Sequence, residues 1–414
     1  MIGKTTFPGA PCRLYKTPWR IKSPAPLLGQ HNEEIFSRFD IGKKEFSEAE
    51  PEAHNPISKP IEGSDSEKQP LKGIRICDLS RFWSGPYCTA YLGGLGAEVI
   101  KVEAIQSVDG FRWPQQKADR WWEGSAQWCS INMNKYDVTL DMNQPRGLEL
   151  VKELIKKSDV LIDNFPPRVM ENFGLTYPVV KELNEDIVMV TLPGYGLTGP
   201  WREYAGFGFA FEQSSGLAYL TGYDDGDPVI IGGAADPIVG THCAFAIQAA
   251  LEYRRRTGNG QFIEISQLEA LTSFMGPAVM DYVVNKRVWG RRGNHNPAMA
   301  PHNIYRCRDD ETWVVIAAQT EEEWQAFCKA TGNPEWARED RFFTLENRLA
   351  NQDELDRLIG EWTIRHDPYG VMDILQKAGV PAGAVTDAHM LREEPHLNER
   401  GFWVEIDREV AGKQ

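Results

Sequence analysis

The sequence has no long hydrophobic run and no surplus of basic residues. No stretch reaches the roughly 18 consecutive apolar residues that a bilayer-spanning helix needs, and the first residues include no apolar signal region. These absences predict a soluble, cytoplasmic protein with no membrane partner. Acidic residues outnumber basic ones by 59 to 45, which gives a net charge of −14. Because binding to a phosphate backbone requires an excess of Lys and Arg, no nucleic-acid partner is expected.

The sequence also lacks the residue spacings that bind metals or form disulfide frameworks. Its seven cysteines are far apart and odd in number, without a C-x-x-C pair, so we expect them to be reduced. The eight histidines form no ligand cluster, since the pairs His295/His302 and His389/His396 are each separated by seven positions. We therefore expect no metal site.

One glycine motif is present but incomplete. Gly194, Gly196 and Gly199 match the G-x-G-x-x-G spacing of dinucleotide-binding loops and follow an expected strand. The next residue is Pro200, and no apolar helix follows whose N-terminus could hold a pyrophosphate. We therefore interpret the motif as a glycine-rich loop and not as a binding site for NAD.

Length and element pattern predict two packed α/β domains. The chain has 414 residues, more than one ordinary domain contains. Strand and helix patterns alternate over 71–292, which is typical of a parallel sheet covered by helices, and we expect a Rossmann-like large domain there. The pattern changes near 293, where Thr320 and Glu323 match a capping box. We expect a smaller α/β domain over 293–385 and a return to the large domain over 386–414.

Two segments precede the large domain. Residues 1–40 are too short for a domain, and their pattern indicates a strand pair and a terminal helix, so this segment is expected to dock onto the large domain. Residues 41–70 are rich in Glu, Ser, Pro and Lys and poor in large apolar groups. Because such a composition cannot offset the entropy of ordering by burial, we expect a flexible linker.

Asp236 is the acidic residue that stands out. It follows four small residues, Gly232–Ala235, and precedes the apolar run 244–247, which is expected to be a buried helix. A carboxylate at the opening of such a helix would accept hydrogen bonds from free N–H groups and stay ionised. The alternative is that Asp236 is only the N-cap of that helix.

Five segments together resemble the family III CoA-transferases, a family that includes formyl-CoA transferase and crotonobetainyl-CoA:carnitine CoA-transferase. The resemblance covers residues 71–414, and the segments that carry it occur in the family's order. They are GIRICDLSRFWSGPYCTAYLGGLGAEVIKVE, NMNKYDVTLDMNQPRGLELVKELIKKSDVLIDNF, LPGYGLTGPWREYAGFGFAFEQSSGLAYLTG, GGAADPIVGTH and YRRRTGNGQFIEIS.

The resemblance implies that Asp236, the aspartate of the GGAAD segment, is a nucleophile. A carboxylate is ionised at neutral pH and needs no base to become nucleophilic. In such an enzyme it attacks the donor thioester to give a mixed anhydride, and the released CoA thiolate converts the anhydride into an aspartyl-CoA thioester. The acceptor carboxylate repeats both steps in reverse. The expected partners are an acyl-CoA and a small carboxylic acid, with no tightly bound cofactor and no metal.

The resemblance also implies where CoA binds. Lys135, Asn164 and Phe165 occupy positions that line the nucleotide part of the cofactor, and Arg112 and Arg168 are further phosphate candidates. Asn164 and Phe165 would follow a parallel strand, where open α/β sheets bind ligands. For Lys135 the alternative is an exposed lysine in a turn.

The chain departs from the family at three places. Trp83 stands where formyl-CoA transferase has a glutamine that assists the thioester oxyanion, so that donor must come from a backbone N–H or another group. The glycine-rich lid of that enzyme is replaced by residues 293–299. Phe207 stands where related α-methylacyl-CoA racemases have a histidine, and without this second proton carrier two-base racemisation is disfavoured.

The order of the segments is also unusual. Residues 1–40 resemble the segment that normally ends the family, whereas the present C-terminus stops where that segment should begin. A circular permutation or a slice of a tandem fusion would explain this order. Either predicts that a strand near Thr5–Phe7 pairs antiparallel with a strand near Trp403–Ile406. Family members form interlocked homodimers, so the resemblance implies a homodimer.

The leading hypothesis is an acyl-CoA:carboxylate CoA-transferase that uses Asp236. A CoA-thioester racemase, isomerase or lyase of the same fold is an alternative. A second alternative is a non-catalytic CoA-binding subunit of a heteromeric transferase. The displaced tail and Trp83 favour this second alternative, whereas the presence of Asp236 argues against it.

Overall fold

The computed structural model describes residues 3–42, 69–113 and 120–408. They form two compact units. The first contains the described residues up to Ala218, Ile230–Val288 and those from Gly401 onward, and the second contains Tyr219–Val229 and Trp289–Arg400. Most of the expected linker, residues 43–68, lies outside the described residues. Within the described part of the chain, no helix is long and apolar enough to cross a membrane.

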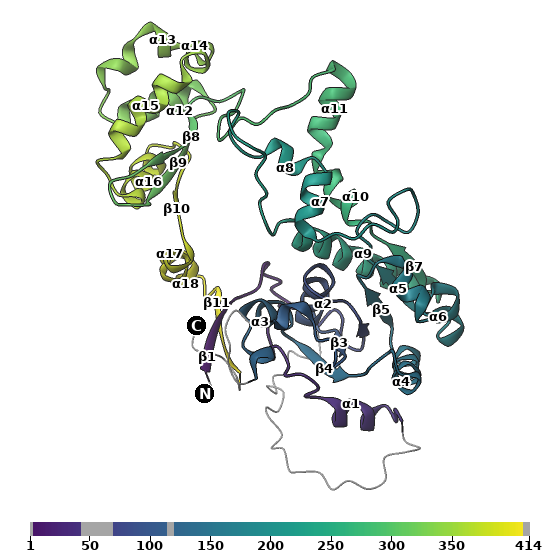
Figure 1. Ribbon diagram of the computed structural model, residues 1–414. Helices are drawn as coiled ribbons and strands as arrows, with labels where there is room; N and C mark the ends of the chain where they lie inside the picture. The colour runs from purple at the N-terminus through teal and green to yellow at the C-terminus, as the bar shows by residue number, and fades with distance from the viewer. Residues whose placement is uncertain (1–2, 43–68, 114–119, 409–414) are drawn as a thin grey trace. The chain divides into compact units, whose positions relative to one another are not determined.

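Six parallel strands form the sheet of the first unit (Figure 1). In spatial order they are β4 (Lys135–Thr139), β3 (Glu98–Glu103), β2 (Arg75–Asp78), β5 (Val160–Asp163), β6 (Val188–Thr191) and β7 (Gln261–Glu264). Strands such as β5 and β6 are buried at every residue, as expected where helices cover both faces. The order reverses at β2, so the carboxyl ends of β2 and β5 flank the crevice where such sheets bind ligands. The predicted α/β fold is confirmed.

Helices cover both faces of this sheet. The α-helices of the first unit are α1 (Asn32–Arg38), α2 (Ser84–Gly94), α3 (Ala126–Ile131), α4 (Pro145–Lys156), α5 (Pro167–Asn172), α6 (Tyr177–Leu183), α7 (Gly208–Ser214), α9 (Ala235–Thr257), α10 (Gln267–Thr272) and α11 (Gly276–Asn285), with α8 (Leu217–Leu220) at the unit boundary; α11 has no buried residue. Adjacent residues of β2 point to opposite faces: Ile76 packs in the cluster with α2 and α9, and Cys77 in the cluster with α1, α4 and α6. Burying one such aliphatic side chain stabilises the unit by about 1.5–3 kcal/mol.

The glycine motif lies in a loop, whereas the apolar run 244–247 lies in a helix. The segment Gly194–Gly199 is a loop, as interpreted, because no helix begins before α7. The run 244–247 lies in α9, but its Phe245 is 73% exposed, so the expectation of a wholly buried helix is wrong. Ala244 and Ile247 face the sheet while Phe245 lies on the opposite side of the helix, as a period of 3.6 residues per turn requires.

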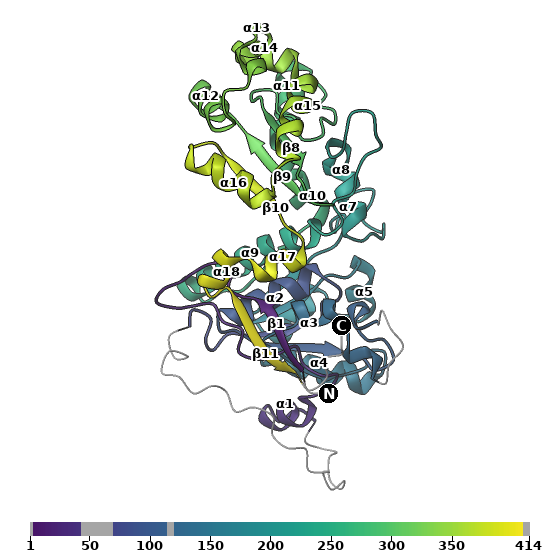
Figure 2. The same ribbon diagram turned by 90° about the vertical axis from the view of Figure 1, so that its left-hand side faces the viewer.

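The N-terminal strand pairs with the C-terminal one, as predicted (Figure 2). β1 (Gly3–Pro8) runs antiparallel to β11 (Trp403–Arg408), with Thr5 opposite Ile406 and Phe7 opposite Val404. The expectation of a second strand within residues 1–40 is wrong, since residues 9–31 form neither strand nor helix before α1 begins. Four prolines lie in this stretch, and each removes a backbone N–H that a strand ladder would use.

The segment between β1 and α1 docks by specific contacts within the first unit. The indole N–H of Trp19 donates to the Tyr91 carbonyl at 2.9 Å, and its ring lies against the backbone of Gly94. The Gly29 N–H donates to Asp137 at 2.6 Å, and Ile35 of α1 is completely buried. These contacts attach the segment to α2 through Trp19 and to β4 through Gly29 and α1.

The second unit is built on a three-stranded antiparallel sheet of order β10-β9-β8. Its strands are β8 (His302–Arg306), β9 (Trp313–Ala317) and β10 (Ala382–Val385). Its helices are α12 (Glu321–Ala330), α13 (Asp340–Phe343), α14 (Leu345–Ala350), α15 (Gln352–Thr363), α16 (Pro368–Lys377), α17 (Ala388–Glu393) and α18 (Pro395–Glu399). Thr320 and Glu323 form the predicted capping box at α12, and the stacked rings of Trp324 and Phe327 lie in the core.

Candidate active site

Asp236 is half-buried in the first turn of α9. The N-cap of that helix is Ala234, so the alternative in which Asp236 is the N-cap is wrong. Its carboxylate instead accepts hydrogen bonds from both the backbone N–H and the hydroxyl of Ser84. Ser84 is the first residue of α2, which means that the carboxylate lies at the N-terminus of a helix other than its own.

Glu212 of α7 takes the free N–H groups at the start of α9. Its carboxylate accepts from the backbone N–H groups of the four residues Gly232–Ala235 at 3.0–3.3 Å. Glu212 is completely buried, and these bonds fix the glycine-rich turn that precedes Asp236. The expectation that Asp236 would accept from these groups is therefore wrong, because Glu212 already occupies them.

The two carboxylates have opposite pKa shifts. Burial raises the pKa of Asp236 from 3.8 to about 6, the bonds from Ser84 oppose this rise, and the nearby charge of Glu212 adds to it. Burial also disfavours the charged form of Glu212. The hydrogen bonds that its carboxylate accepts from the backbone of Gly232–Ala235 outweigh this effect and lower its pKa. At neutral pH both side chains are ionised, and Asp236 is the more basic of the two.

Backbone from two glycines lies close to Asp236. A Cβ at Gly208, the first residue of α7, would overlap the Oδ2 of Asp236. Gly233 has a φ of 140°, which favours glycine, and a Cβ there would lie 3.1 Å from the ring of Trp83. The space around the carboxylate therefore depends on residues without side chains, and Trp83 borders it.

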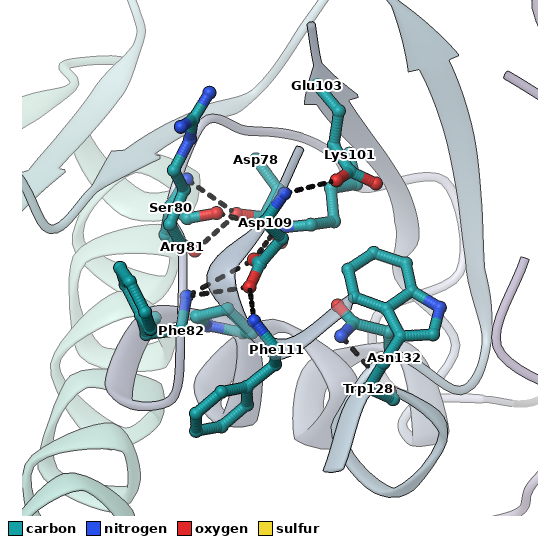
Figure 3. A network of polar contacts seen from close by, with 12 residues as sticks. Asp78, Ser80, Arg81, Phe82, Lys101, Glu103, Asp109, Phe111, Trp128 and Asn132 are labelled. Carbon is teal, nitrogen blue, oxygen red and sulfur yellow. Dashed lines mark hydrogen bonds and ion pairs between the residues drawn. The ribbon is translucent and has the colours of Figure 1, made fainter. Parts of the chain in front are cut away.

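The loop between β2 and α2 is held by three polar side chains. The Ser80 N–H and hydroxyl donate to Asp78, and the Arg81 N–H donates to Asn164 at 2.8 Å. The Phe82 N–H donates to both carboxylate oxygens of Asp109 at 3.2 Å, as Figure 3 shows. These bonds fix the loop that leads directly into Trp83 and Ser84.

Asn164 connects this loop to the candidate nucleophile. Its side-chain N–H groups donate to the Arg81 carbonyl at 2.6 Å and to the Ser84 hydroxyl at 3.4 Å. The Ser84 hydroxyl in turn donates to Asp236. Asn164, which follows β5 as predicted, is therefore one residue away from Asp236 in a chain of hydrogen bonds.

Phe165 lines a cavity of about 250 Å³ beyond the carboxyl ends of β2, β3, β4 and β5. The cavity lining is largely apolar, and Arg81 is its basic residue. The Arg81 guanidinium lies 6.0 Å from the Phe165 ring and donates to the hydroxyl and carbonyl of Ser107 at 2.8 Å. A flat apolar group could stack on Phe165 there, with a cation at its edge.

Lys135 is inside the fold, so its alternative as an exposed turn lysine is wrong. The ammonium lies 3.2 Å from Asp78 and donates at 2.9 Å to the Pro86 carbonyl and to Asn132. Burial lowers its pKa to about 8, although the charge of Asp78 acts in the other direction. All three ammonium protons thus have acceptors within the protein, and the side chain is 3% or less exposed.

Arg112 is also buried, and the structure does not bring it to the cavity lining. It pairs with Glu103 at 2.8 Å, with Glu123 at 3.1 Å and with Asp137 at 3.4 Å. Arg168, by contrast, is exposed on α5 and lies 3.8 Å from Glu203. It directly precedes Val169, which lines the cavity.

The structure thus brings Asp236, Asn164 and Phe165 to one edge of the sheet and places Lys135 and Arg112 in its interior. Sequence reasoning missed Glu212, Ser84 and Arg81. Ser84 carried one usable signal, since a serine at a helix start commonly bonds a nearby polar group. Glu212 carried none, because its bonding partners lie twenty and more positions along the chain.

These features define an α/β protein with a half-buried carboxylate near the start of α2 and a cavity beyond the carboxyl ends of its parallel strands. The profile of CoA-transferase family III matches residues 71–413. The chain is 34% identical, over 81% of its length and 83% of the relative, to a succinyl-CoA–D-citramalate CoA-transferase from Chloroflexus aurantiacus. It is 32% identical to a succinyl-CoA–L-malate CoA-transferase alpha subunit from the same organism, over 89% of this chain and 85% of that subunit.

A solved structure agrees with these sequence matches. The crystal structure of a CAIB/BAIF family protein from Brucella suis superposes with a TM-score of 0.74 at 32% identity, covering 80% of this chain and 88% of that one. The chain therefore belongs to CoA-transferase family III, and it is a CoA-transferase. Enzymes of this family use CoA thioesters as substrates.

Proposed function

We propose that the protein exchanges CoA between two carboxylic acids and that Asp236 is the nucleophile. The observation that carries this proposal is the position of the carboxylate, which is half-buried, ionised at neutral pH, and held by Ser84 against the backbone of Gly208. A fixed carboxylate with a pKa of about 6 is a better nucleophile than a free one and needs no general base.

The reaction proceeds in four covalent steps. An Asp236 oxygen attacks the donor thioester carbon, and the C–S bond breaks. This step releases the CoA thiolate and forms an aspartyl–acyl anhydride. The thiolate then attacks the aspartyl carbonyl, which expels the donor acid as its carboxylate and leaves an aspartyl-CoA thioester. The acceptor carboxylate attacks that thioester to form a second anhydride and free thiolate. Attack of the thiolate on the acceptor carbonyl releases the new acyl-CoA and regenerates the Asp236 carboxylate.

The cavity beside Phe165 is the proposed site for the nucleotide part of CoA. The loop between β2 and α2 borders both places, since Arg81 lines the cavity while Ser84, three residues later, bonds Asp236. Arg81 and Arg168 are the proposed phosphate contacts, because one lines the cavity and the other is exposed next to it. Lys135 and Arg112 would hold the β-sheet edge together and would not contact the cofactor in this conformation.

A homodimer is proposed because α11 lacks apolar cover within its own unit. None of its residues is buried. Five of its apolar side chains are 47–66% exposed, namely Val279, Met280, Tyr282, Val283 and Val284. A patch of this kind on a helix marks a protein interface. A solution mass equal to one chain would contradict the dimer, and association only with a different polypeptide would favour the heteromeric alternative.

A chemical test of the nucleophile uses a quenched reaction. The protein is incubated with an acyl-CoA, denatured and digested, and the peptide that carries Asp236 is weighed. We expect a mass increase equal to CoA minus water, which Asp236→Asn abolishes together with transfer. Asp310→Asn, an exposed matched variant, should keep both. Normal transfer by Asp236→Asn would show that the assigned nucleophile is wrong.

A further inference from the structure

A continuous row of aromatic rings lies beside Asp236. Neighbouring ring centroids along the row are 5.2–6.1 Å apart. In order, the rings belong to Trp83, Phe111, Phe82, Phe207 and Phe209. We call this set the aromatic row. Such edge-to-face and offset contacts are favourable for aromatic side chains, so the row is a stable surface.

The aromatic row borders Asp236 on two sides. On one side, the ring of Trp83 lies against Gly233, and the next residue, Ser84, bonds the carboxylate. On the other side, Phe207 directly precedes Gly208, whose backbone touches the Oδ2 of Asp236. An acyl group bonded to this carboxylate would therefore lie along the rings.

The rings near Asp236 are exposed rather than part of the core. Phe207 and Phe209 are each 54% exposed, and Phe82 is 37% exposed. An apolar ligand that covers them gains free energy from the water it displaces. This exposure distinguishes the row from the aromatic core of the second unit, where Trp324 and Phe327 are almost completely buried.

The orientation of Phe82 is imposed by the backbone. Its φ is +61°, a conformation that non-glycine residues rarely adopt. The strain is maintained by Asp109, whose carboxylate accepts from the N–H groups of Phe82 and Phe111 and pairs with buried Lys101 at 3.1 Å (Figure 3). Strained residues that the surrounding structure holds in place are common at ligand sites. Asp109 therefore fixes two rings of the row before any ligand binds.

The charge near Asp236 disfavours a second carboxylate. The charged side chain that acts on Asp236 is Glu212, which is negative. A dicarboxylic acyl group would place a second negative charge near Glu212 and against the aromatic rings. An uncharged acyl group avoids this repulsion and covers the rings.

We propose that the aromatic row is the acyl-group site and that it selects acyl groups carrying an aromatic ring or a similarly bulky apolar group. This inference rests on the proposed function, since it places the acyl group on Asp236. It distinguishes the chain from relatives whose names specify succinyl-CoA.

The test compares donors and a truncated ring. Transfer to a common acceptor, acetate, is measured with phenylacetyl-CoA, acetyl-CoA, succinyl-CoA and a trimethylammonium acyl-CoA, for the wild type and for Phe207→Ala. Formation of the CoA adduct on the Asp236 peptide is followed in parallel. We expect kcat/KM for phenylacetyl-CoA to exceed that for succinyl-CoA by about tenfold or more, the discrimination that one apolar contact provides.

The variant separates ring contact from general damage. Phe207→Ala should lower kcat/KM for phenylacetyl-CoA by about tenfold more than for acetyl-CoA, mainly through KM. Phe343→Ala, which removes a 68% exposed ring in α13, should leave kcat/KM unchanged for both donors. The inference is overturned if the wild type prefers succinyl-CoA or the trimethylammonium donor. It is also overturned if Phe207→Ala lowers kcat/KM equally for phenylacetyl-CoA and acetyl-CoA. In both cases, formation of the CoA adduct would leave the proposed function intact. Absence of the adduct with every donor would overturn both.

Discussion

The ionisation of Asp236 should be visible in the pH dependence of the reaction. Only the carboxylate form can attack a thioester, so the rate falls as the pH falls through the pKa of Asp236 in the folded enzyme. Because burial raises that pKa to about 6, we expect the acid limb of kcat/KM to have its midpoint near pH 6 and not near pH 4. Removing the hydroxyl of Ser84 takes away one bond that favours the ionised form, so the limb should move to higher pH.

The size of the effect follows from the bond that is lost. A hydrogen bond to a charged group contributes about 1.5–3 kcal/mol, but the Ser84 backbone N–H still donates in Ser84→Ala and water can replace part of the hydroxyl contact. A loss of about 1.4 kcal/mol moves the midpoint up by about one pH unit. At pH 6 the ionised fraction would then fall roughly fivefold, while above pH 8 it would hardly change.

The assay is the profile of kcat/KM between pH 5 and 9 for the wild type, Ser84→Ala and a matched control. Ser214→Ala removes an exposed hydroxyl from α7 and should keep the wild-type profile. Thermal unfolding of each variant checks that the fold is retained, because Ser84 also accepts a bond from Asn164. An acid limb that stays in place in Ser84→Ala, or one near pH 4 in the wild type, would refute this reasoning.

Three further variants test other contacts of the first unit. Glu212→Gln should lower the free energy of unfolding by about 2–4 kcal/mol in a urea titration, since one amide oxygen cannot accept hydrogen bonds from four N–H groups. The same variant should lower the midpoint of the acid limb of kcat/KM, because it removes the charge that raises the pKa of Asp236. Gly208→Ala should reduce kcat by about 100-fold by displacing Asp236, whereas Gly360→Ala, at an open position of α15, should not change kcat. Arg408→Met should lower the free energy of unfolding by about 3–5 kcal/mol, because Arg408 is buried and anchors β11 through Glu123; an unchanged melting temperature would contradict this role.

Much of the parallel sheet could be predicted from the sequence, because its strands are short apolar runs with clear ends. The alternation of strands and helices expected over 71–292 is observed from β2 to β7. The start of α9 was predicted to within one residue from the small residues before Asp236. The pairing of β1 with β11 was predicted from the family order, since no local pattern joins segments almost 400 residues apart.

The environment of charged residues was harder to predict, since it depends on partners far along the chain. Lys135 was expected to line the nucleotide part of CoA, with an exposed turn lysine as the alternative, yet it is buried and contacts Asp78, 57 positions earlier. Arg112 seemed a phosphate ligand, but three acidic residues from separate elements surround it. Buried ion pairs of this kind form only when the whole sheet is assembled, so neither composition nor spacing indicates them.

Glu212, and not Asp236, accepts the hydrogen bonds from the N–H groups at the start of α9, and this has a chemical consequence for the proposed mechanism. Had the N–H groups at the start of α9 bonded Asp236, its pKa would have been lowered, and a less basic carboxylate is a weaker nucleophile. With Glu212 in that place, Asp236 keeps a pKa of about 6 and is still mostly ionised at pH 7. The same group must also leave when an anhydride is cleaved, and a strongly basic group would leave slowly. A pKa between those of a free carboxylate and a thiol suits an oxygen that must form and release acyl bonds in every turnover.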